Sequence, residues 1–120
     1  METKVSNKPK YDLEERTARF ARDVRSFVSR LPKNIAFVED GKQLVRSSGS
    51  VGANYIEANE TLSKKDFVMR AKICRKEAKE SRYWLQMFVN LPNDLVGERD
   101  KLIQESTELL RMFSAMIATV

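Results

Sequence analysis

The chain has 120 residues, of which 42% are apolar, and this length and composition allow one domain with one hydrophobic core. It contains no histidine and a single cysteine, Cys74, which excludes Ser-His-Asp and Cys-His catalysis, histidine-ligated metal sites and an intrachain disulfide. Four glycines, three prolines and 32% charged residues favour long helices, and the net charge of +5 permits an anionic partner such as nucleic acid.

The N-terminal segment, residues 1–11, is predicted to be a flexible basic tail, because it carries three lysines and few side chains that could be buried. It lacks the apolar run of a secretion signal. No stretch of the sequence approaches the roughly 20 apolar residues of a membrane span. Together with the single cysteine, these features predict a soluble, cytoplasmic protein without a membrane partner.

The first two helices are predicted from apolar residues that recur at steps of three and four. The first begins at Asp12, whose carboxylate suits a helix N-terminus, and Pro32 ends it. The second runs from about Asn34 to about Leu62. Its centre, residues 48–53, is rich in serine and glycine, which are poor helix formers. We interpret this stretch as a place where another backbone packs closely; the alternative is a loop.

A third helix is predicted to run from the capping pattern at Ser63 to about Asn90. A fourth helix follows the turn at residues 91–94. Four long helices joined by short loops predict an all-α, antiparallel up-down-up-down four-helix bundle over residues 12–120. The residues predicted to be buried are Leu13, Phe20, Val24, Phe27, Leu44, Val51, Tyr55, Phe67, Cys74, Leu85, Phe88, Leu102, Leu109 and Phe113.

Polar side chains form a narrow face on the second helix, beside its apolar stripe, and a matching face on the third. If the two helices form a hairpin, Arg46 approaches the carboxylate of Glu77 or Glu80. The pattern fits either a polar binding site or a hydrogen-bonded network that fixes packing between helices or subunits. The predicted set is Gln43, Arg46, Ser50, Asn54, Glu57, Arg70, Glu77, Glu80 and Trp84.

The same hairpin brings Glu57 towards Arg70 or Lys72. Glu57, Glu77 and Glu80 could form an acid/base or metal-binding set, but carboxylate sites in bundles normally include histidine, and this chain has none. Nearby arginines and lysines would instead neutralise the carboxylates as ion pairs. The sequence therefore predicts no catalytic residue, no metal site and no cofactor.

Three further side chains on the third helix have alternative roles. Cys74 lies in phase with the apolar stripe and is predicted to be a small buried hydrophobe. Tyr83 and Trp84 could stack on nucleic-acid bases, or Trp84 could pack inside the bundle or at a subunit contact.

The third helix is basic, with eight basic and three acidic residues between Lys64 and Asn90. Seven of the basic residues fall within an arc of about 120° that faces away from much of the apolar stripe. This arc could contact a phosphate backbone, or it could be an ordinary solvated helix face. The candidate nucleic-acid-binding residues are Lys64, Lys65, Lys72, Arg75, Lys76, Lys79 and Arg82.

Three segments in combination, residues 43–58, 63–67 and 76–85, closely resemble the bacterial four-helix-bundle family of 23S rRNA intervening-sequence proteins. The resemblance covers about residues 12–118. The family's pattern falls on Gln43, Arg46, Ser50, Asn54, Glu57, Phe67, Lys76, Glu77, Glu80, Tyr83, Trp84 and Leu85.

This resemblance implies a four-helix bundle that assembles into a ring-like homopentamer. What it implies about function is less specific. A related group of accessory proteins in diversity-generating retroelements binds nucleic acid and a reverse transcriptase. We therefore expect a non-enzymatic homo-oligomer that binds RNA, which could be rRNA, or DNA through charge. The alternative is a scaffold that binds a protein partner.

Overall fold

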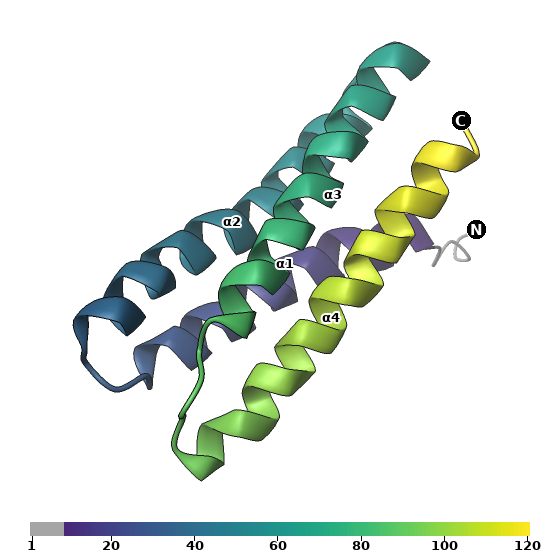
Figure 1. Cartoon of the computed structure of the whole chain (residues 1–120). Coiled ribbons are helices and arrows are strands. Elements are labelled where there is room, and N and C mark those ends of the chain that lie inside the picture. Colours follow the sequence, from purple (N-terminus) through teal and green to yellow (C-terminus); the bar gives the residue numbers. More distant parts are fainter. Residues whose placement is uncertain (1–8) are drawn as a thin grey trace.

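The protein folds into four α-helices. The computed structural model describes the backbone of residues 9–120 and the side chains from Leu13 onward. The helices are α1 (Pro9–Ser29), α2 (Ile35–Asn59), α3 (Lys64–Gln86) and α4 (Asn93–Ala118). Successive helices run antiparallel, and α1 and α4 also pack together (Figure 1). Residues 9–120 contain no β-strand, so the predicted all-α, up-down-up-down bundle is confirmed.

The helix limits follow local signals in the sequence. The Asn34 side chain accepts a hydrogen bond from the Phe37 amide at 2.8 Å and caps α2. The Ser63 hydroxyl accepts one from the Asp66 amide at 3.1 Å and caps α3, as predicted. These two helices end three and four residues before the predicted ends.

The start of α1 differs from the prediction. This helix begins at Pro9, so Asp12 lies inside the first turn and is not the residue before the helix. Proline suits this position because its fixed φ and missing amide hydrogen cost nothing at the first helical residue. The predicted boundary between tail and bundle therefore moves towards the N-terminus, and residues 1–8 of the predicted tail lie outside the described residues.

The serine- and glycine-rich centre of α2 is helical and packs closely against α1. A Cβ atom added to Gly52 would lie 2.9 Å from Oγ1 of Thr17 and 3.7 Å from the Thr17 backbone, so one of these groups would have to shift. The buried hydroxyls of Ser47 and Ser48 bond to carbonyls within α2. The interpretation of this stretch as a close helix contact is confirmed, and the loop alternative is wrong.

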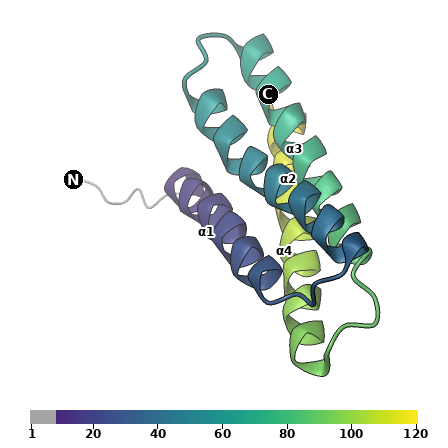
Figure 2. The same ribbon diagram turned by 90° about the vertical axis from the view of Figure 1, so that its left-hand side faces the viewer.

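Aromatic side chains pack near the end of the core where α1 ends and α2 begins, and apolar side chains fill the rest of its length. Phe88 makes edge-to-face contacts with Phe27 and Phe37, at ring-centroid distances of 5.6 and 5.3 Å. Every residue predicted to be buried is buried except Phe67, which is half-buried. The connection between α2 and α3 projects past the ends of α1 and α4, where little covers it, so Leu62 is fully exposed and Phe67 partly so (Figure 2).

Candidate functional site

The seven basic side chains predicted to bind nucleic acid lie on the surface of α3. Lys64, Lys65, Lys72, Lys76 and Lys79 are exposed, and Arg75 and Arg82 are half-buried. Among the residues whose side chains are described, none of the seven forms an ion pair. We call these seven residues the basic face. Their charges are therefore available to an external anion.

Two grooves border the basic face. Five of its residues, together with Leu110 of α4, line a groove of about 510 Å³, and Arg82 donates to the Thr107 hydroxyl of α4 at 3.3 Å. The other two residues, Lys64 and Lys65, line a second groove of about 490 Å³ near the C-terminal Val120. Lys72 lines both grooves, so the positive surface is continuous along α3.

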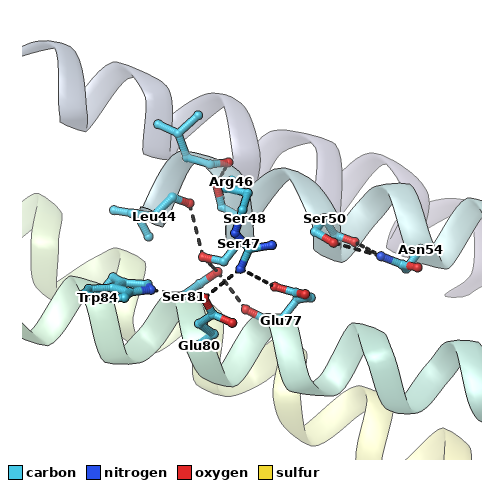
Figure 3. A network of polar contacts seen from close by, with 11 residues as sticks. Leu44, Arg46, Ser47, Ser48, Ser50, Asn54, Glu77, Glu80, Ser81 and Trp84 are labelled. Carbon is cyan, nitrogen blue, oxygen red and sulfur yellow. Dashed lines mark hydrogen bonds and ion pairs between the residues drawn. The ribbon is translucent and has the colours of Figure 1, made fainter. Parts of the chain in front are cut away.

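A polar network joins α2 to α3 (Figure 3). The Arg46 guanidinium contacts the Glu80 carboxylate at 2.7 Å and the Glu77 carboxylate at 3.2 Å, as the hairpin geometry predicts. The indole N–H of Trp84 donates to the same Glu80 carboxylate at 3.3 Å. Burial acts to raise the pKa of Glu80, but the hydrogen bonds from Arg46 and Trp84 outweigh it and lower the pKa below its usual value. Glu80 is thus held as a charged acceptor between two donors.

A buried pair of hydroxyls completes this network. Ser47 and Ser81 are fully buried, and their Oγ atoms are 2.9 Å apart. Ser81 also donates to the Glu77 carbonyl at 2.9 Å. This serine pair was not predicted from the sequence, because each serine resembles a small residue of the apolar stripe. Two small polar residues in phase on facing helices are the signal that could have revealed the pair.

The other predicted polar residues are arranged differently from the expectation. Arg70 donates to the side-chain oxygen Oδ1 of Asn54 at 3.0 Å, and the Asn54 side-chain amide donates to the Ser50 hydroxyl at 2.9 Å. Glu57 and Gln43 are exposed, and within residues 13–120 their side chains form no hydrogen bond or ion pair. The predicted approach of Glu57 to Arg70 or Lys72 is therefore wrong, because Arg70 turns towards the amide one helical turn away.

An apolar groove that the sequence analysis missed lies where α1 meets α2. It has a volume of about 470 Å³, and Val28, Phe37, Val38 and Val45 contribute to its lining. Ile35, at the start of α2, is 83% exposed. Ile35, Val38 and Val45 fall outside the buried stripe of α2, and apolar residues off the stripe are the signal by which this surface could have been found.

The remaining chemistry of the described residues is simple. Cys74 is fully buried, and burial raises its pKa to about 12. In the part of the chain that the structure describes, no group of three or more acidic or cysteine side chains is placed to hold a metal ion. None of the four helices is long and apolar enough to cross a bilayer.

Comparison with known proteins identifies the family. The model of the 23S rRNA-intervening sequence protein family matches residues 10–115. The fold is similar to a crystal structure from Bacteroides thetaiotaomicron, a protein of unknown function from the S23 ribosomal protein family, with a TM-score of 0.76 and 24% identity over 91% of this chain and 97% of that one. No curated protein matches the sequence. Because the family match includes nearly all of the four helices, the chain belongs to the 23S rRNA-intervening sequence protein family.

Proposed function

We propose that the protein is a non-enzymatic nucleic-acid-binding protein that contacts RNA through the basic face of α3. The observation that supports this proposal is a continuous row of seven basic side chains that have no acidic partner among the described residues. Other surface charges of the bundle are paired, as Arg46 of α2 is with Glu80 of α3. Unpaired cations along one helix are the arrangement that phosphate binding requires.

The mode of binding follows from the chemistry of this surface. Lysine and arginine neutralise phosphates and release condensed counterions, so affinity falls steeply as salt concentration rises. Phosphate contacts carry no base information, so the basic face gives little sequence preference. The family's name refers to 23S rRNA, which makes ribosomal RNA a natural first ligand to test.

The test replaces Lys72, Lys76 and Lys79 together by glutamate. All three side chains are exposed, so the bundle should fold as in the parent. We expect weaker RNA binding at low salt, and a plot of log affinity against log salt whose slope is smaller by about 3, because three phosphate contacts are lost.

A matched control replaces Lys33, Lys42 and Lys101 by glutamate. These lysines are also exposed, they lie away from the basic face, and the control changes the net charge equally. The proposal predicts that this control binds RNA almost as well as the parent. Equal losses in the two triple variants would show that net charge alone governs binding, and parental affinity in the first variant would show that the basic face is only a solvated surface.

We also propose that the protein assembles into a homopentamer. The resemblance to ring-forming proteins suggests this state, and the outer face of α2 and α3 supports an interface of some kind. Ile56 of α2 is 53% exposed, and Ile73 and Trp84 of α3 are half-buried. A ring would cover these apolar groups and repeat the basic face, which multiplies weak contacts. Light scattering should give a mass about five times that of the 13.9 kDa chain; a monomer at micromolar concentration would contradict this proposal.

The apolar groove between α1 and α2 favours a second candidate function, that of a scaffold for a protein partner. Val38 of its lining is exposed, as is Ile35 at the start of α2, and exposed apolar side chains of this kind are typical of a contact surface. A specific protein recovered with the parent after nuclease treatment, and lost when Ile35 and Val38 are both replaced by glutamate, would support this function. Salt-dependent retention of the protein on RNA would instead support nucleic-acid binding through the basic face.

A further inference from the structure

Tyr83 lies on the basic face as an exposed aromatic side chain. It follows Lys76 by seven residues and Lys79 by four, and these spacings place all three on the same side of an α-helix. Tyr83 is 53% exposed, whereas each other aromatic residue from Leu13 to Val120 is buried or half-buried. The ring and the neighbouring lysine side chains are therefore accessible to the same ligand.

The polar network behind Tyr83 holds its neighbour in place. The rings of Tyr83 and Trp84 meet edge to face, with centroids 5.0 Å apart and planes at 75°. Trp84 is fixed by its hydrogen bond to Glu80, which is in turn bound by Arg46. In an edge-to-face pair at most one face of each ring is covered by the partner, so at least one face of Tyr83 is not covered by Trp84.

We propose that Tyr83 stacks on an unpaired base, and that the ligand of the basic face is therefore single-stranded nucleic acid. This inference rests on the proposed function, because the lysines supply the phosphate contacts that bring the strand to the ring. In a duplex both faces of each internal base are already stacked, so an exposed tyrosine adds little. A single strand offers free faces, and every base has one, so stacking strengthens binding without selecting a sequence.

The sequence offered both Tyr83 and Trp84 for stacking, with packing as the alternative for Trp84, and the structure separates the two residues. Trp84 is half-buried and its N–H is bonded, which gives it a packing role. Tyr83 is the ring that a ligand can reach. The polar network thus positions the aromatic pair, and the basic face and Tyr83 form one binding surface.

The test compares a labelled oligo(U) RNA strand, free and paired with oligo(A), in binding to the full chain and to three variants. Replacing Tyr83 by alanine should weaken binding of the free strand by about 5- to 150-fold, the range expected for one lost base stack. The same variant should bind the duplex as the parent does. Tyr83→Phe keeps the ring and should retain the parental preference.

A matched control is Met69→Ala. Met69 is 55% exposed on the same helix, but it has no ring. We expect this variant to bind both ligands as the parent does. Because Trp84 is the one tryptophan of the chain and touches Tyr83, its emission should also change when the free strand binds, and this change should be lost in Tyr83→Ala.

The outcomes separate this inference from the proposed function. If Tyr83→Ala binds the free strand as tightly as the parent, or loses free strand and duplex equally, stacking on Tyr83 is wrong while binding through the basic face stands. If the parent binds neither ligand at low salt, the proposed function fails and this inference fails with it.

Discussion

Replacement of Gly52 by alanine tests the close packing of α1 against α2. In an isolated helix this change is favourable, because alanine exceeds glycine in helix propensity by about 1 kcal/mol. In the bundle the new Cβ would lie 2.9 Å from Oγ1 and 3.2 Å from Cβ of Thr17. Thr17 is only 1% exposed and its hydroxyl is bonded to the Glu14 carbonyl, so it has little room to move.

The expected magnitude is the difference between these two effects. Overpacking of a tight contact costs about 1–3 kcal/mol, and the short distance here favours the upper part of that range. We therefore expect Gly52→Ala to lower the free energy of unfolding by about 1–2 kcal/mol, or the melting temperature by about 4–8 °C for a chain of this length.

Gly97→Ala is the matched control. Gly97 lies inside α4, and apart from its chain neighbours and the backbone of its own helix no atom lies within 4 Å of the position its Cβ would take. Only the propensity gain remains, so this variant should be more stable than the parent by about 1 kcal/mol. The two substitutions are chemically identical and should have opposite signs.

Urea denaturation followed by circular dichroism, at one protein concentration for all variants, measures both effects. The double variant Thr17→Ala/Gly52→Ala removes the hydroxyl of the shorter contact and should recover about 0.5 kcal/mol or more relative to additivity. If Gly52→Ala is as stable as the parent, or if the double variant shows no coupling, the reasoning about close helix packing is refuted.

Two further outcomes follow from the ionisable groups. The lowered pKa of Glu80 means that its carboxylate stabilises the fold above its ordinary pKa of 4.5, and that this contribution is lost as the pH falls through the lower folded value. The parent should therefore be more stable than Glu80→Gln at pH 7 by about 1 kcal/mol or less, and the gap in urea denaturation should close below pH 4.5; a gap independent of pH would contradict this. Cys74, buried and with its pKa raised to about 12, should react with a thiol reagent slowly in the native protein and rapidly in denaturant, and fast native reaction would show that the site opens.

The fold was largely predictable because its signals are local. The apolar spacing along each helix and the caps at Asn34 and Ser63 depend on residues within one or two turns. The start of α1 was misplaced because Asp12 and Pro9 both suit a helix start, and nothing nearby in sequence chooses between them. The spacing of apolar residues along α3 placed Phe67 in the core, but the spacing within one helix does not show how far the neighbouring helices extend.

The candidate site was predictable in its composition and only partly in its contacts. Hairpin arithmetic placed Arg46 opposite Glu77 and Glu80, because antiparallel neighbours with a short connection have a simple register. The same arithmetic did not predict that Arg70 would form its hydrogen bond with Asn54 and not with Glu57. Long side chains can reach several partners, and burial and rotamer decide among them.

By itself the sequence determined four amphipathic helices, their order and the basic character of α3, since these depend on residue type and on the helical period alone. Only the tertiary structure decided that α1 lies against Gly52, that Ser47 meets Ser81, and that Tyr83 is exposed while Trp84 is held by Glu80. Such contacts depend on the offset and crossing of packed helices, which arise from the fit of many side chains at once and leave no short-range pattern in the chain.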